Sequence, residues 1–216
     1  MVDKCLGEDE SMKLPAVIQA YHVSHTKPKV NIYYPVIIQL EDPKIQQQLN
    51  QVIFTEMNKL LVEQNYYEPS LVELVADFEI KNNQRGILSL NLIVYSFTGG
   101  AHGMTVCKSL TFDTRTGRSY SLPDLFKPGS PYVQRISEYV RRHIEKWKTP
   151  VLEPFKQIRP DQDFYIADTS LVVYFQLYEI SPYVAGFPYF PIPLLDLEDL
   201  IKPGSPADRM LPFIGV

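Results

Sequence analysis

Cysteine, tryptophan and long apolar runs are scarce in this chain of 216 residues. The two cysteines, Cys5 and Cys107, are too few for the disulfide framework of a small secreted domain. Cys107 lies in a strand-like pattern, where a small buried apolar side chain is expected. No stretch approaches the roughly 20 apolar residues that cross a bilayer, so we expect no membrane span.

The chain has fewer basic than acidic residues, with 21 Lys and Arg against 25 Asp and Glu, so its net charge is -4. This balance argues against a nucleic-acid partner, because binding to phosphates needs clustered Lys and Arg. The local basic group lies on a predicted helix that also carries Glu138 and Glu145, which is typical of a solvated helix face. The group consists of Arg135, Arg141, Arg142, Lys146 and Lys148.

The amino terminus offers no targeting signal. Its first ten residues are acidic and lack the apolar core of a secretory signal, and no apolar stretch precedes Cys5. This favours an intracellular location unless a leader has been removed. We expect residues 1–13, which show no periodicity, to form a flexible tail.

Proline and tyrosine are abundant, with 18 and 14 residues in a chain that is 45% hydrophobic. The prolines lie between strongly periodic segments, which excludes a collagen-like or disordered chain. Tyrosine suits half-buried sheets and binding surfaces alike. At this length the chain can form one large domain, or two small ones that share a core.

The apolar pattern of the first half predicts strands around one long helix. Residues 30–40 alternate as a half-buried strand, and Pro35 within them predicts an edge strand or a bulge because proline cannot donate to a sheet ladder. Asp42 followed by proline predicts the N-cap of the helix. An antiparallel meander is predicted next, over residues 72–80, 88–94 and 104–112, with a turn at residues 81–86.

The second half predicts another long helix, from Ser130-Pro131 to Trp147, and then a hairpin over residues 164–178. Strands and helices are segregated rather than alternating, so we predict an α+β fold, a mainly antiparallel sheet with two long helices packed across it. We expect an amino-terminal α+β part, residues 14–121, and a carboxy-terminal α+β part, residues 122–216, joined in one compact unit.

One eight-residue segment occurs twice, since residues 124–131 and 199–206 are identical at seven positions. In each copy, Lys-Pro-Gly is expected to stop a short helical turn and Ser-Pro to begin the next helix. The flanking residues do not match. We therefore interpret the repeat as a shared capping solution rather than as a duplicated domain.

The loop Gly99-Gly100-Ala101-His102-Gly103 is the sharpest local feature. Its glycines allow positive φ angles and the close approach of another group. His102 could therefore bind a ligand or act as a general base, or its ring could simply cap backbone groups in a tight turn. No nearby serine or cysteine forms a known nucleophile pattern, which makes a catalytic His102 the weaker interpretation.

Aromatic and proline residues crowd together near the carboxy terminus. Rigid turns that display aromatic rings suit the recognition of sugars or peptide surfaces, although the same rings could instead close one end of the core. Besides His102, the candidate ligand-binding residues are therefore Tyr178, Tyr183, Phe187 and Tyr189.

No group of side chains has the spacing of a metal site. His22 and His25 are three positions apart on a predicted strand, so they point to opposite faces and cannot chelate one metal. Asp161 and Asp163 resemble the start of a calcium loop, but the glycine and the closing glutamate are missing. We therefore predict no metal and no cofactor.

Two segments together resemble a known family: the Gly99–Gly103 loop followed by a strand, and Tyr178-Glu179-Ile180-Ser181-Pro182-Tyr183-Val184-Ala185-Gly186 followed by Ile192-Pro193. They are similar to the paired domains of unknown function in the lysozyme-sensing anti-sigma factor RsiV and ahead of the catalytic domain of the peptidoglycan deacetylase PdaC. The resemblance runs from about residue 15 to residue 200. It implies a firmicute-type bacterial α+β domain with no established catalysis of its own, which in the anti-sigma factor lies outside the membrane and binds lysozyme.

These observations favour a non-catalytic binding module for a cell-wall glycan or a wall-active protein such as lysozyme. Two alternatives stay open. A hydrolase centred on His102 would need an acidic or nucleophilic side chain within reach of its ring. A structural homo-oligomer is favoured if the strand of Pro35 is an exposed edge that pairs across a two-fold axis.

Trp147 and His102 give a first testable contrast. We expect Trp147 to be largely buried and Trp147→Ala to be poorly folded, since truncating a buried aromatic side chain typically costs about 3–5 kcal/mol. His102→Ala should keep near-native stability, because a loop histidine contributes mainly to local order or binding. Thermal melts of both variants check this, and a less stable His102 variant would make the loop a structural feature.

Overall fold

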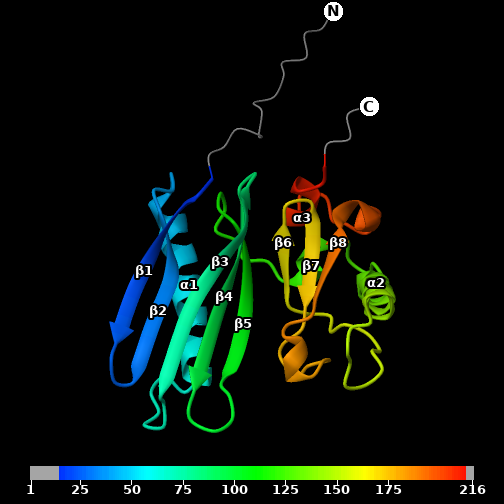
Figure 1. The fold of residues 1–216 in the computed structure, drawn as a ribbon. Coiled ribbons are helices and arrows are strands. Elements are labelled where there is room, and N and C mark those ends of the chain that lie inside the picture. The colour runs from blue at the N-terminus through cyan, green and yellow to red at the C-terminus, as the bar shows by residue number, and fades with distance from the viewer. Residues whose placement is uncertain (1–14, 213–216) are drawn as a thin grey trace, which may run out of the picture.

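The computed structural model of the protein describes residues 15–212, which form two sheets with one long helix packed on each (Figure 1). The first sheet has five strands in the order β1-β2-β3-β4-β5, and the second has three in the order β6-β7-β8. The predicted α+β class, with a mainly antiparallel sheet and two long helices, is confirmed. The predicted tail, residues 1–13, and Cys5 lie outside the described residues.

The elements follow the chain in two groups. The first group is β1 (Val17–His25), β2 (Lys29–Ile38), α1 (Pro43–Glu63), β3 (Glu73–Gln84), β4 (Ile87–Phe97) and β5 (Met104–Asp113). The second group is η2 (Leu122–Leu125), α2 (Tyr132–Trp147), β6 (Phe164–Ala167), β7 (Ser170–Tyr174), η3 (Tyr183–Ala185), β8 (Tyr189–Pro193), η4 (Leu194–Leu197) and α3 (Pro206–Arg209).

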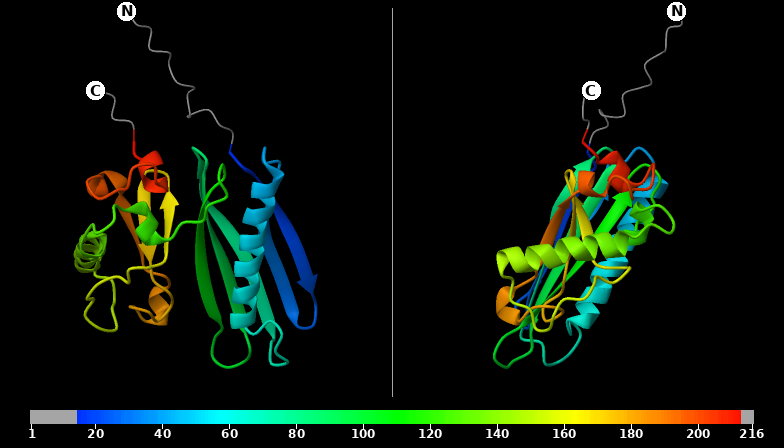
Figure 2. Two further views of the ribbon diagram at one scale, coloured as in Figure 1. Left: turned by 180° about the vertical axis from the view of Figure 1, so that it is seen from behind. Right: turned by 90° about the vertical axis from the view of Figure 1, so that its right-hand side faces the viewer.

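The two long helices lie at opposite sides of the molecule. Seen from behind, α1 crosses the strands of the first sheet, while α2 lies beyond the second sheet (Figure 2). Alternate residues of β4, such as Leu88 and Leu90, pack under α1, whereas Ser89 faces the second sheet and accepts a hydrogen bond from the backbone N–H of Ile166 (3.1 Å). The second sheet therefore packs on the side of the first sheet that α1 does not cover.

Helix α1 begins where the sequence predicts. The Asp42 carboxylate accepts a hydrogen bond from the backbone N–H of Lys44 (2.8 Å), which caps the first turn. The helix connects β2 to β3, and these two strands are parallel, whereas the other neighbouring strands are antiparallel. Its buried residues are Leu49, Ile53, Met57, Leu60 and Leu61.

The strand of Pro35 is not an edge strand, and that prediction is wrong, because β2 lies between β1 and β3. Its pairing with β3 nevertheless ends at Ile32, before Pro35 is reached. Beyond that point Ile37 donates its N–H to Asn50 Oδ1 (2.8 Å) and accepts from Asn50 Nδ2 (2.8 Å). The missing N–H of Pro35 thus falls on a side where no strand is paired, which explains why proline is tolerated.

The turn between β3 and β4 is shorter than predicted. The polar run after Ile80 continues the strand, with a bulge between Ile80 and Asn82, and the chain reverses at Arg85-Gly86 alone. Both residues have positive φ angles (54° and 71°), as a tight two-residue hairpin requires. Asn82 is buried and donates to the Ile87 carbonyl (2.8 Å). The sequence suggested a loop here because Asn82 is polar, but its side chain is satisfied by this hydrogen bond inside the strand pair.

Helix α2 differs from two predictions, its N-cap and the burial of Trp147. It begins at Tyr132 with Pro131 as N-cap, and no side chain caps it, so Ser130 is not the N-cap. Trp147 is not buried: it is 48% exposed, because the helix ends there and its ring packs on His143 and Phe190 at the rim of the core. The residues of α2 that enter the core are Ile136, Val140 and Ile144.

Strand β8 was not predicted from the sequence, because its prolines are untypical of a strand. Phe190 and Ile192 are buried, whereas Pro191 and Pro193 alternate with them on the exposed face. Because β8 is at the end of its sheet, proline is tolerated there. The preceding hairpin of β6 and β7 is confirmed, although β7 ends at Tyr174 instead of Tyr178.

The two copies of the repeated segment lie against each other. Phe126 and Ile201, at equivalent positions, form an antiparallel bridge. The backbone N–H of Lys127 donates to the Leu200 carbonyl and that of Lys202 to the Leu125 carbonyl, both at 2.9 Å. The capping interpretation is therefore incomplete, since the copies pair as well as cap. Ser205 does cap α3, whereas Ser130 caps no helix.

Phe190 and Trp147 give a matched test of this packing. Phe190 is 1% exposed, so Phe190→Ala should lower the free energy of unfolding by about 3–5 kcal/mol. Trp147→Ala should lower it by only about 1–2 kcal/mol, since nearly half of that side chain already meets water. Urea unfolding of both variants measures the difference, and a larger loss for Trp147→Ala would contradict the packing described.

Candidate functional site

The loop between β4 and β5 and the segment before β8 both lie at the lower end of the molecule in Figure 1. The His102 ring stacks on the Tyr183 ring, with centroids 4.2 Å apart and planes 25° apart. The Tyr183 hydroxyl also donates to the Gly103 carbonyl (3.2 Å). Two segments that are 80 positions apart in the chain thus form one surface.

The protonation of the His102 ring follows from its one hydrogen bond. Its Nδ1 lies 2.8 Å from the Gly103 carbonyl, and a carbonyl can only accept, so Nδ1 carries the proton. In the neutral ring Nε2 is then an acceptor with a lone pair. Among residues 15–212, no acidic or nucleophilic side chain is hydrogen-bonded to this ring.

The glycines of the loop have two different roles. Gly99 and Gly100 have φ angles of 101° and 99°, which side chains rarely allow. Gly103 is needed for close packing, because a Cβ atom there would lie 2.4 Å from the Ser96 carbonyl oxygen and 2.4 Å from the Tyr95 ring. The loop is therefore held against β4, and this fixes the position of His102.

The segment after β7 is held by a carboxylate. Glu179 Oε2 accepts the backbone N–H of Gln176 (2.7 Å), and its other oxygen contacts Arg159 and Gln162. Tyr178 sits at the tip of this turn with a φ angle of 65°, and its ring lies 5.7 Å from that of Tyr183. We refer to the rings of His102, Tyr183 and Tyr178 as the aromatic ledge.

Gln176 joins this segment to the first sheet. Its Nε2 donates to the Cys107 carbonyl (2.7 Å), and its Oε1 accepts the Cys107 N–H (3.1 Å). This is the hydrogen-bond pattern of a neighbouring strand, made here by one side chain on the free edge of β5. The local sequence pattern did not indicate the roles of Gln176 and Glu179. For Glu179 the one available signal was its position within the segment Tyr178–Gly186, on which the family resemblance rests.

Phe187 and Tyr189 do not join the aromatic ledge. Their ring centroids lie 6.2 Å apart at the edge of the buried cluster of Cys107, Tyr165, Val172 and Tyr174. Tyr189 is 36% exposed, and its ring centroid lies 6.2 Å from that of Tyr165 and 5.6 Å from that of Tyr174. Burial raises the pKa of the Cys107 thiol at the centre of this cluster to about 12. Burial likewise raises the pKa of Tyr165 to about 12 and also raises the pKa values of Tyr174 and Tyr189.

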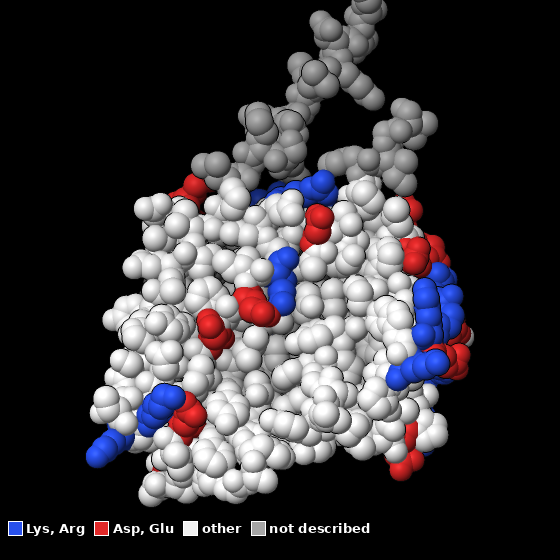
Figure 3. All heavy atoms as spheres, viewed as in Figure 1, with Lys and Arg blue, Asp and Glu red and all other residues white. Residues whose placement is uncertain are grey.

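The surface around the lower ends of β4 and β5 carries little charge. On the face seen in Figure 1, Lys, Arg, Asp and Glu leave the lower centre free (Figure 3). No three His, Cys, Asp or Glu side chains within residues 15–212 gather as a metal site would require. His22 instead lies 2.7 Å from Asn31 Oδ1 and stacks on Tyr33.

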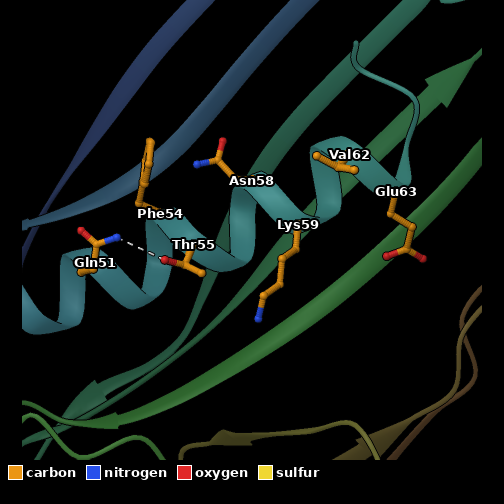
Figure 4. Close-up of a pocket in the computed structure, with 7 residues that line it drawn as sticks. All are labelled: Gln51, Phe54, Thr55, Asn58, Lys59, Val62 and Glu63. Carbon is orange, nitrogen blue, oxygen red and sulfur yellow. Dashed lines mark hydrogen bonds between the residues drawn. The ribbon is translucent and has the colours of Figure 1, made fainter. Parts of the chain in front are cut away.

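A shallow groove of about 530 Å³ lies elsewhere, along the outer face of α1 (Figure 4). Phe54 and Val62 supply its apolar surface and are 51% and 61% exposed. Lys59 and Glu63 flank it, and Gln51 donates to the Thr55 hydroxyl within it (3.2 Å). The groove shares no residue with the aromatic ledge.

The two halves of the chain match two family models. Residues 24–105 match the model described as Deacetylase PdaC, and residues 123–194 match the one described as protein of unknown function DUF3298. The chain is 25% identical over 188 residues to the anti-sigma-V factor RsiV of Bacillus subtilis (strain 168). It is 24% identical over 143 residues to the peptidoglycan-N-acetylmuramic acid deacetylase PdaC of the same organism. The resemblance is confirmed.

The matches differ in coverage. The alignment with RsiV covers 80% of this chain and 65% of RsiV, and that with PdaC covers 60% of this chain and 29% of PdaC. The chain thus spans less than two thirds of either relative. None of the helices in residues 15–212 combines the length and apolar character that a bilayer crossing demands.

Two crystal structures share the fold. A DUF3298 family protein from Pseudomonas aeruginosa superposes with a TM-score of 0.68 at 18% identity, over 94% of this chain and 99% of that one. A DUF3298 family member from Bacteroides fragilis gives a TM-score of 0.64 at 15% identity, over 90% and 95%. At these identities the similarity concerns the fold alone.

The raised pKa values in the buried cluster around Cys107 lead us to expect that the free energy of unfolding falls at alkaline pH. Its thiol and phenols have raised pKa values in the folded chain, so they stabilise it fully below their ordinary values of 9.0 and 10.0. That stability is lost as pH rises toward about 12. Urea unfolding between pH 8 and 12 should show the decline, and Tyr165→Phe should make it shallower. An unchanged pH profile for Tyr165→Phe would contradict this.

Proposed function

We propose that the protein is a non-catalytic binding module whose ligand docks on the aromatic ledge. The exposure of this region supports the proposal, since Tyr178 is 46% exposed and Val184, next to Tyr183, is 90% exposed. Aromatic rings with polar tips are enriched at binding surfaces, because they offer a large apolar area together with a hydrogen-bonding group.

The proposed ligand is a cell-wall glycan or a wall-active protein such as lysozyme. Sugar rings present apolar C–H faces that stack on tyrosine and histidine rings, and sugar hydroxyls can pair with the free Nε2 of His102 or with phenol groups. Figure 3 shows few charged residues around the lower ends of β4 and β5 on the face that it views, which suits recognition by ring stacking and hydrogen bonds rather than by ion pairs. One relative is named for peptidoglycan N-acetylmuramic acid, which supports the glycan.

The rigidity of the site is a second support. Gln176 ties the segment to β5 by two hydrogen bonds, and the Glu179 carboxylate closes the turn that carries Tyr178. Gly103 holds the loop of His102 against β4. A surface that is ordered before binding loses less conformational entropy when the ligand docks, so it binds more tightly.

The proposal assigns no reaction to His102. Its ring contributes an aromatic face and one acceptor nitrogen, because its Nδ1–H is already bonded to the Gly103 carbonyl. A general base would need a partner that raises its basicity or a nucleophile to activate. Neither is hydrogen-bonded to it within residues 15–212, so no observation favours the hydrolase.

Titration calorimetry with soluble muropeptides, and separately with lysozyme, tests the proposal. One of the two should bind, and Tyr183→Ala should weaken that binding by about 30-fold, as expected for a central aromatic contact worth about 2 kcal/mol. His102→Ala should weaken it as well while the thermal melt stays near that of the native chain.

Phe54→Ala is the matched control, because Phe54 is also an aromatic side chain on the surface but lies on α1, away from the aromatic ledge. It should leave binding unchanged. The absence of heat with both ligands at high micromolar concentration would overturn the proposed ligands, and an equal loss for Phe54→Ala and Tyr183→Ala would overturn the proposed surface.

A further inference from the structure

Free strand edges are closed at several places in this fold. On β5, Gln176 pairs with Cys107, and the returning chain adds hydrogen bonds from Asp113 N–H to the Arg118 carbonyl and from Tyr120 N–H to the Thr111 carbonyl (both 2.9 Å). On β2, Asn50 closes the part that β3 leaves. On β8, prolines alternate along the strand. Such devices prevent edge-to-edge pairing.

Within residues 15–212, none of these devices closes the free edge of strand β1. It is the end strand of the first sheet, and its nine residues pair with β2 in one unbroken antiparallel register. Its sequence, Val-Ile-Gln-Ala-Tyr-His-Val-Ser-His, contains no proline and no Lys, Arg, Asp or Glu. All of its residues except Ile18 and Val23 are exposed. A long, uncharged and regular edge is the kind that pairs with another strand.

The register shows which backbone groups of β1 are free. In β2, the odd-numbered residues Lys29 and Ile37 donate away from β1, so the even-numbered residues are the ones that bond to it. Their partners are the odd-numbered residues of β1, for example Tyr21 opposite Tyr34. The N–H and C=O groups of the residues between them therefore point outward: Ile18, Ala20, His22 and Ser24.

We propose that β1 pairs with β1 of a second copy of this chain, antiparallel about a two-fold axis at Tyr21. In this register Ala20 lies opposite the second copy's His22, and Ile18 lies opposite its Ser24, so the four outward-facing residues of each strand meet as hydrogen-bonded pairs. The two five-stranded sheets then form one continuous sheet. A two-fold interface of this kind is self-complementary and closes on itself.

The sequence of β1 favours a second copy as the occupant. Like charges directly opposite each other destabilise a strand pair, and this symmetric register contains no ionised pair. It also places the exposed Tyr21 opposite Tyr21 of the second copy, and cross-strand aromatic pairs are stabilising. The ring centroid of Tyr21 already lies 5.3 Å from that of Tyr34 within the same chain. The expected homo-oligomer thus uses β1 rather than the strand of Pro35, and it leaves the aromatic ledge free.

Light scattering of the full chain over a concentration series tests the pairing. The mass of the native chain should rise from 24.9 kDa to twice that value. The double variant Ala20→Glu/His22→Glu should stay at the monomer mass, because it places carboxylates opposite each other across the axis. Ala20→Lys/His22→Lys should stay monomeric for the same reason. An equimolar mixture of the two should regain the dimer mass, because opposite charges then meet.

The control puts the same charge on another exposed surface. Gln51→Glu/Thr55→Glu lies in the groove of α1 and should dimerise as the native chain does, and circular dichroism should show that all variants are folded. A native chain that stays at 24.9 kDa up to high micromolar concentration would overturn the proposal. Dimerisation of either charged β1 variant alone, or loss of the dimer in the α1 variant instead, would also overturn it.

Discussion

Side-chain amides that take the place of missing strands hold this fold together. Asn50 makes two hydrogen bonds to Ile37, and Gln176 makes two to Cys107. Asn83 does the same for Ala16, accepting its N–H (2.9 Å) and donating to its carbonyl (2.8 Å). A backbone group that is removed from water without a partner destabilises the fold by about 1–3 kcal/mol. These amides let the sheets end irregularly without that loss.

The two halves of the chain also join through buried polar and charged groups that need partners. Their contact includes the buried ion pair of Asp113 and Arg209 (2.7 Å), whose side chains are only 6% and 11% exposed. Arg85, at the β3–β4 turn, donates to the carbonyls of Arg209 and Leu211 (2.8 and 3.0 Å). Removing one member of a buried pair leaves an uncompensated charge, so these contacts specify how the carboxy-terminal part docks.

The aromatic ledge depends on this docking. His102 lies in the half that matches the PdaC family model, whereas Tyr178 and Tyr183 lie in the half that matches DUF3298. Gln176 bridges the halves next to it. Neither half alone presents the three rings, so the binding surface proposed on the ledge needs both halves of the chain.

The sequence by itself determined the α+β class, the start of α1 at Asp42, the meander and the glycine loop, because these rest on local periodicity, capping and turn chemistry. Local composition also brought His102, from the glycine-rich loop, and Tyr183, from the aromatic and proline-rich segment, into one candidate set. Only the tertiary structure decided that Trp147 lies at a rim, that Pro35 faces an unpaired side, and that Phe187 and Tyr189 pack at the edge of the Cys107 cluster instead of joining the aromatic ledge. Burial depends on where a helix or strand ends relative to its neighbours, and no local pattern contains that information.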